Sequence, residues 1–283
     1  MTEDDIIKKY SRCPYGEPEF TELYNFSEKE IQKYCEWIRR HNAPIANAWD
    51  IDKNTYWTAK YYLATKYLFI SNLFMSSYSY AKDKNLKIVL PYLIYYSLLT
   101  VSRALILTSP RDDKPINFVR SHKMIITETA DIIAKLNFNK GQEYLKTINN
   151  AKINRELFSY KFPASGLNLI NEDLNKILKQ VNLIKELAIL NSEILSVKLD
   201  KIKDKTVFYV DGSSDSILYD LFEYGDKLDN NDYNNAGYIG TKIQRPMPLN
   251  FMISEGIEDD LYLNWAPDNE DGDLYIPPLY IFN

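Results

Sequence analysis

The segment Leu86–Lys123 is the most apolar part of this chain, and it constrains the fold more than any other feature. Its apolar run covers residues 88–102, which is too short to span a bilayer, and Arg103 follows it directly. An apolar run of this length that meets a charge at its end is typical of a buried helix. We therefore predict a central core helix here, ending at Ser109, and we expect no membrane partner.

The composition predicts a mainly α fold. Hydrophobic residues make up 45% of the 283 residues, which is enough for a substantial core and excludes wholesale disorder. The chain has only nine glycines, and Leu, Ile, Lys and Glu are abundant, so helix is favoured over a turn-rich β architecture.

Helical spacing of apolar residues recurs on both sides of the central segment. Ser27 and Glu30 have the spacing of a capping box, and the helix that they open is expected to end near Asn42, before Pro44. Asn137 to Gly141 is expected to form a turn. Further helices are expected at residues 53–82, at 142–150 and at 171–203. Another is expected to end at residue 136, with Ser121 or Asn117 as its N-cap.

The pattern changes at Lys205, where we expect a boundary between two parts of the chain. Residues 206–210 form a β-type run, and short strand-like runs follow at 249–253, 261–265 and 275–282. The sequence therefore predicts a helical body at residues 1–204 and a small C-terminal appendage of β or irregular structure at residues 205–283.

Charge is distributed unevenly between these two parts. The whole chain has a net charge of −5, yet residues 205–283 hold 15 acidic and only 4 basic side chains. The body is therefore mildly basic and the appendage strongly acidic. A nucleic acid would be attracted to the body and repelled by the appendage, although two ordinary solvated surfaces would give the same pattern.

The sequence has no recognisable metal or cofactor motif. Cys13 and Cys35 have neither metal-ligand nor disulfide-framework spacing, and His41 and His122 are the only histidines. Nucleophile-elbow and dinucleotide fingerprints are also missing. We expect no cofactor and no metal. The charged segment at residues 1–10 lacks the apolar core of a signal peptide, so we expect a cytoplasmic protein.

Two groups suited to phosphate chemistry lie around the central helix. Tyr96 and Arg103 fall on one face of that helix, and His122 opens the next one. An arginine can bind a phosphate through two hydrogen bonds, and a histidine can move protons near neutral pH. Antiparallel packing would bring the two together in a site suited to cleavage of RNA without a metal ion. Arg103 and His122 are the candidate catalytic residues.

Further phosphate contacts are expected at the start of the second helix, from Arg120, Ser121 and Lys123. Tyr96 is a fourth candidate substrate-binding residue. A purely structural interpretation also holds at each position. Arg103 would then form a salt bridge to Glu128 or Asp131, and His122 would be a capping or packing residue.

The same stretch resembles the HEPN superfamily of small helical bundles, and in particular its YaaC-like branch. The resemblance covers about residues 50–200. It depends on a pair of tyrosines, six further residues, an Arg-Ala-Leu-Ile-Leu run, a polar loop and Ser-His-Lys at a helix start. The matching residues are Tyr95, Tyr96, Arg103, Ala104, Leu105, Ser121, His122 and Lys123.

The resemblance implies a helical bundle and a role in bacterial defence or a toxin–antitoxin system, where many HEPN proteins are ribonucleases. Such bundles often pair, so it also implies a homodimer that forms a shared cleft. Catalytic members carry Arg and His separated by four to six residues, and this chain has no such spacing, so Arg103 and His122 would act across two helices. The alternative is a non-catalytic module that binds RNA or a partner protein of a defence operon.

Overall fold

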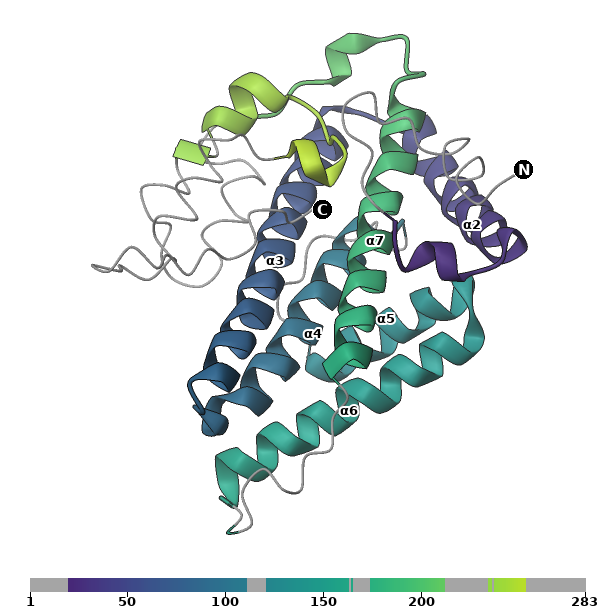
Figure 1. Ribbon diagram of the computed structural model, residues 1–283. Helices are drawn as coiled ribbons and strands as arrows, with labels where there is room; N and C mark the ends of the chain where they lie inside the picture. Colours follow the sequence, from purple (N-terminus) through teal and green to yellow (C-terminus); the bar gives the residue numbers. More distant parts are fainter. Residues whose placement is uncertain are drawn as a thin grey trace.

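The computed structural model describes residues 20–110, 121–162, 164, 174–211, 234–235 and 237–252. Within them the chain forms six α-helices and no strand, which confirms the mainly α fold (Figure 1). The helices are α2 (Glu28–Asn47), α3 (Ile51–Asp83), α4 (Leu90–Thr108), α5 (His122–Leu136), α6 (Phe138–Tyr160) and α7 (Leu174–Leu199).

Helix α4 is the centre of the bundle, as the sequence predicts. It packs against α3, α5, α6 and α7, and nearly every residue from Ile94 to Thr108 is buried (Figure 1). In the described residues, the segment Lys87–Thr108 is the one helix long and apolar enough to cross a membrane. Most of that segment is buried inside the protein, which is the pattern of a core helix in a soluble protein.

Helix α2 begins at the predicted capping box but extends further than expected. The backbone N–H of Ser27 donates to Oε2 of Glu30 over 3.0 Å. The prediction that the helix ends before Pro44 is wrong, because α2 continues to Asn47. Pro44 removes one backbone hydrogen-bond donor in the last turn of α2. Ile45 is buried on the helix face that also buries Ile38, so the packing of this face outweighs the loss of that hydrogen bond.

The predicted turn at Asn137–Gly141 and the short helix after it are also wrong. Asn137 alone separates α5 from α6, and its side-chain oxygen accepts a hydrogen bond from the backbone N–H of Lys140 over 3.1 Å. Gly141 lies within α6, where a Cβ atom would be 2.7 Å from the carbonyl oxygen of Ala130. Glycine here permits close packing of two helices and does not mark a turn.

Gly141→Ala is expected to destabilise the protein. The new methyl group would meet backbone in α5, and such overpacking costs about 1–3 kcal/mol, which exceeds the gain of up to ~1 kcal/mol in helix propensity. Chemical denaturation of both proteins would measure the difference. Gly237→Ala is the control, because no atom lies within 4 Å of a Cβ there. Equal stability of the Gly141 variant and the parent protein would contradict the close approach of α5 and α6.

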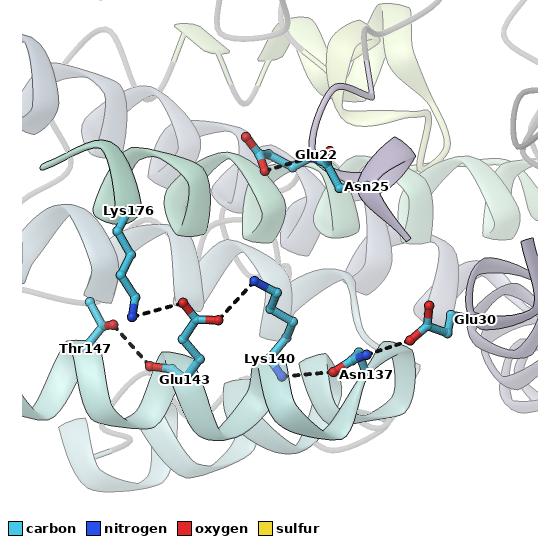
Figure 2. Close-up of polar contacts among 8 residues, drawn as sticks. All are labelled: Glu22, Asn25, Glu30, Asn137, Lys140, Glu143, Thr147 and Lys176. Carbon is cyan, nitrogen blue, oxygen red and sulfur yellow. Dashed lines mark hydrogen bonds and ion pairs between the residues drawn. The ribbon is translucent and has the colours of Figure 1, made fainter. Parts of the chain in front are cut away.

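Polar contacts fix the start of α6 between α2 and α7 (Figure 2). The side-chain amide of Asn137 donates to Glu30 of α2. Further along α6, Glu143 forms ion pairs with Lys140 and with Lys176 of α7, each over 3.0 Å. The α5–α6 hairpin is therefore attached to two other helices at the junction between α5 and α6.

The described N-terminal segment is attached to α7 through a buried carboxylate. Glu186 accepts hydrogen bonds from the backbone N–H groups of Glu22 and Leu23, over 2.9 Å and 2.8 Å, and from the hydroxyl of Thr21 over 3.1 Å. Burial raises the pKa of Glu186, while these hydrogen bonds act in the opposite direction. The segment around the 3₁₀ turn η1 (Leu23–Asn25) thereby covers this side of α7.

Two of the predicted strands are wrong. Residues 206–210 begin in the 3₁₀ turn η4 (Lys205–Val207), and residues 249–253 begin in another, η6 (Leu249–Phe251). The β-branched and aromatic residues of the first run favour extended backbone, but Thr206 and Phe208 bond locally to Asp204 and Lys205, and the end of the run bonds to a side chain of α3. Asn54 donates to the carbonyl of Tyr209 over 2.8 Å. The other strand-like runs, 261–265 and 275–282, lie outside the described residues.

The described part of the appendage packs against α3 and α7. Thr65 of α3 donates to the carbonyl of Leu249 over 3.3 Å, and the backbone N–H of Leu249 donates to Ser192 of α7 over 3.1 Å. Its buried apolar side chains belong to the main core: Val210, Ile239, Ile243, Leu249 and Met252. The division at residue 205 remains a prediction of the sequence.

Candidate functional site

The N-terminus of α5 places His122 beside α4. Ser121 is the N-cap, and its hydroxyl accepts a hydrogen bond from the backbone N–H of Met124 over 3.3 Å. Ser121 has extended backbone, which turns the chain into the helix at His122. His122 is partly exposed, so its imidazole is accessible to a ligand.

A tyrosine of α4 holds the imidazole. The hydroxyl of Tyr95 lies 2.8 Å from Nδ1 of His122, and the two rings are tilted with centroids 5.8 Å apart. Tyr95 itself is buried. This bond occupies Nδ1 and leaves Nε2 for an incoming group. When Nδ1–H donates to the tyrosine oxygen, Nε2 has a free lone pair and can accept a proton.

An arginine of α6 completes this side of the cluster. The guanidinium carbon of Arg155 lies 4.8 Å from the centroid of the Tyr95 ring, and its Nη1 donates to the hydroxyl of Tyr96 over 3.3 Å. Its Nη2 forms an ion pair with the neighbouring Glu156 over 3.2 Å. Aromatic stacking and two polar contacts thus fix the position of a cation close to His122.

Arg103 lies on the same face of α4 as Tyr96, two turns further along the helix. Its guanidinium carbon is 5.5 Å from the centroid of the Tyr67 ring in α3, and its side chain is partly exposed. Within the described part of the chain, no ion pair joins Arg103 to Glu128 or Asp131. Its guanidinium nitrogens therefore have capacity to bind a ligand.

The three basic residues act electrostatically on one imidazole. Burial lowers the pKa of His122, and the positive charges of Arg103, Arg155 and Lys152 lower it further. These effects favour the neutral form of the His122 imidazole. A neutral imidazole near positive charges is suited to accept a proton beside a bound anion.

The structure brings together some of the candidate residues from the sequence. Tyr96 binds Arg155 as described, and its ring lies 6.0 Å from that of Phe74, centroid to centroid. Ser121 acts as the helix cap. Lys123 is exposed on the first turn of α5 and forms none of the contacts recorded within the cluster. Arg120 lies outside the described residues.

Sequence analysis missed the contribution of α6. Lys152, Arg155 and Ser159 follow one another at intervals of three and four residues, which is the spacing of one helix face. The hydroxyl of Ser159 donates to Tyr92 of α4 over 3.0 Å, so this face packs along α4. The spacing of these three residues indicates a shared helix face. The sequence predicts that this helix ends at residue 150, whereas α6 continues to Tyr160.

The cluster can bind an anion and exchange a proton with it. We define this cationic cluster by its histidine, three cations and two tyrosines: His122, Arg103, Lys152, Arg155, Tyr95 and Tyr96. Phosphate and carboxylate groups both suit its guanidinium groups. In the described residues, no group of three or more His, Cys, Asp and Glu side chains lies close enough together to hold a metal ion.

No protein-family profile, curated protein or solved structure matches this chain.

Proposed function

We propose that this chain is a cytoplasmic, HEPN-like endoribonuclease of a bacterial defence or toxin–antitoxin system, and that its cationic cluster cleaves RNA without a metal ion. The observation that supports this proposal is a partly exposed imidazole held by Tyr95, whose ring also stacks on the guanidinium of Arg155. The positive charges of Arg103, Arg155 and Lys152 also lower the pKa of His122. The resemblance of α4 and the start of α5 to HEPN bundles supports the biological role.

In the proposed reaction, Nε2 of His122 takes the proton from a ribose 2′-hydroxyl. The 2′-oxygen attacks the adjacent phosphorus, and the bond from phosphorus to the 5′-oxygen breaks. The imidazolium returns its proton to the departing 5′-oxygen, so the products are a 2′,3′-cyclic phosphate and a 5′-hydroxyl. Arg103 and Arg155 stabilise the negative charge that develops on the phosphate oxygens.

Each supporting residue has one role in this scheme. Tyr95 fixes the orientation of His122 through Nδ1. Tyr96 positions Arg155 and, beside Phe74, offers an aromatic surface for a base. Ser121, Lys123 and Arg120 are proposed to contact neighbouring phosphates. A homodimer would extend this surface with a second copy of the site.

The test is incubation of the purified protein with a panel of single-stranded and structured RNAs in EDTA. The proposal predicts cleavage products with 2′,3′-cyclic phosphate ends. Chemical mapping of the new ends distinguishes this chemistry from hydrolysis that leaves a 3′-hydroxyl. Intact RNA throughout the panel would contradict the enzyme.

The second candidate is a non-catalytic module that binds RNA or a protein of the same operon. It is favoured by the lack of a local Arg–His spacing and by the Glu156 carboxylate, which lies 3.2 Å from Arg155 and competes with an anion. Tight RNA or protein binding, without cleavage and dependent on Arg103, would support this function instead.

A further inference from the structure

One end of the bundle carries exposed apolar side chains. They lie at the end of α3, in the 3₁₀ turn η2 (Lys87–Val89) with the residue before it, and at the end of α6. Leu86 is 50% exposed, Ile88 53%, Tyr160 81% and Phe162 71%. Tyr80 and Val89 are exposed beside them. We refer to these six residues as the apolar tip.

The two segments of the apolar tip lie at the same end of the molecule. Figure 1 shows the connection between α3 and α4 and the end of α6 projecting together from the bundle. The hydrogen bond of 3.0 Å between Ser159 and Tyr92 joins the last turn of α6 to the first turn of α4. The tip consists of helix ends and a connecting turn, so it is a projection rather than a groove.

Lysines alternate with these apolar side chains. Lys82, Lys84 and Lys87 lie among the apolar residues of the first segment, and Lys161 lies between Tyr160 and Phe162. All four are exposed, and Asp83 is the one acidic residue within residues 80–89 and 160–162. A net positive charge therefore surrounds the exposed apolar groups.

Exposed apolar side chains surrounded by lysines suit some classes of partner better than others. RNA would use the lysines and aromatic rings but would leave Leu86, Ile88 and Val89 in water. A second copy of the chain would bring two sets of lysines together. The surface of an anionic bilayer satisfies both features, because apolar side chains enter the boundary between headgroups and acyl chains while lysines pair with the headgroups.

We propose that the apolar tip binds the surface of membranes that contain anionic lipids. The tip inserts Leu86, Ile88 and Phe162 shallowly, and the surrounding lysines contact phosphate and carboxylate headgroups. The sequence predicts no membrane partner, because its longest apolar run is too short to span a bilayer. Contact at the surface does not require a spanning helix. The proposal is also independent of RNA cleavage, since the tip shares no side chain with the cationic cluster.

The test is co-sedimentation of the full chain with lipid vesicles. We expect binding to phosphatidylcholine vesicles that contain about one third phosphatidylserine, and much weaker binding to phosphatidylcholine alone. Each of Lys84→Gln and Lys87→Gln should weaken partitioning about fivefold, and added salt should weaken it further. The double variant Ile88→Ser with Phe162→Ser should weaken it on the order of tenfold or more.

Phe138→Ser is the matched control, because Phe138 is 67% exposed but lies at the opposite end of α6. Its variant should bind vesicles as the parent protein does. Three results would overturn the proposal: no binding of the parent protein to anionic vesicles, full binding by the double variant, or an equal loss in the Phe138 variant. Self-association that the double variant abolishes, without vesicle binding, would assign the tip to a second copy.

Discussion

Removal of residues 205–283 is expected to unfold the helical body. The described appendage places five apolar side chains in the core, including Leu249 and Met252, which are both 0% exposed. Complete burial of such side chains contributes about 1.5–3 kcal/mol each, and the total stability of a typical domain is about 5–15 kcal/mol. Truncation would also deprive the buried amide of Asn54 of two carbonyl partners, those of Tyr209 and Gln244.

Circular dichroism and thermal unfolding of the truncated chain would measure this effect. A point substitution gives a finer test, because Leu249→Ala should cost about 2–5 kcal/mol. Tyr209→Ala is the control, since that side chain is 54% exposed and surface changes usually alter stability by about 0.5 kcal/mol or less. A cooperative transition in the truncated chain at the parent midpoint would instead show that residues 1–204 fold independently.

His122→Ala and Arg103→Ala are each expected to eliminate most RNA cleavage. Loss of a general base typically lowers kcat by about 10²–10⁴-fold, and loss of a charge-stabilising donor by about 10²–10³-fold. Both effects arise because the imidazole takes the proton of the 2′-hydroxyl and the guanidinium stabilises the charge that develops on the phosphate oxygens in the transition state. The measurement is single-turnover cleavage of one RNA in EDTA.

His41→Ala and Arg40→Ala are matched controls on α2, because both residues are exposed there. Nδ1 of His41 lies 2.8 Å from the carbonyl oxygen of Trp37, and this contact does not involve the cationic cluster. Both control variants should cleave RNA at the parent rate. Unchanged cleavage by the His122 variant would remove the histidine from the mechanism even if the protein is a ribonuclease.

The core helix and the position of His122 could be predicted from local patterns. The apolar run that ends at Arg103 identified α4. Of the two caps that the sequence offers for the next helix, Ser121 and Asn117, Ser121 is the one at the start of α5. Both depend on residues near in sequence, whose helical spacing and capping preferences are local properties. The same reasoning predicted the capping box at Ser27.

The errors arose where tertiary contacts override local preference. Gly141 is in a helix because α5 and α6 approach closely there, and this could not be inferred from the glycine alone. Residues 206–210 have strand-forming side chains, yet Tyr209 is bonded through its carbonyl to Asn54 of α3, and the next residue, Asp211, donates to Thr55. Arg155 joins the cluster only through the packing of α6 on α4, so its role was not visible in sequence.

The pH dependence follows from the direction of the His122 shift. Its pKa in the folded protein is below the ordinary 6.5, mainly through burial and then through Arg103, Arg155 and Lys152. An anion bound among these residues would offset their charge and favour the imidazolium. Binding should therefore raise the pKa of His122. The affinity for the anion should increase as the pH falls and His122 becomes protonated.

The most direct test is an NMR titration of the imidazole signals against pH, with and without a dinucleotide that lacks the 2′-hydroxyl and cannot be cleaved. The chain has two histidines, so His41 serves as an internal control. We predict a His122 pKa below 6.5 in the free protein that rises when the dinucleotide binds, and a clear loss of this rise in Arg103→Ala. A His122 pKa at or above 6.5 that does not respond to the dinucleotide would contradict an anion-binding site at this imidazole.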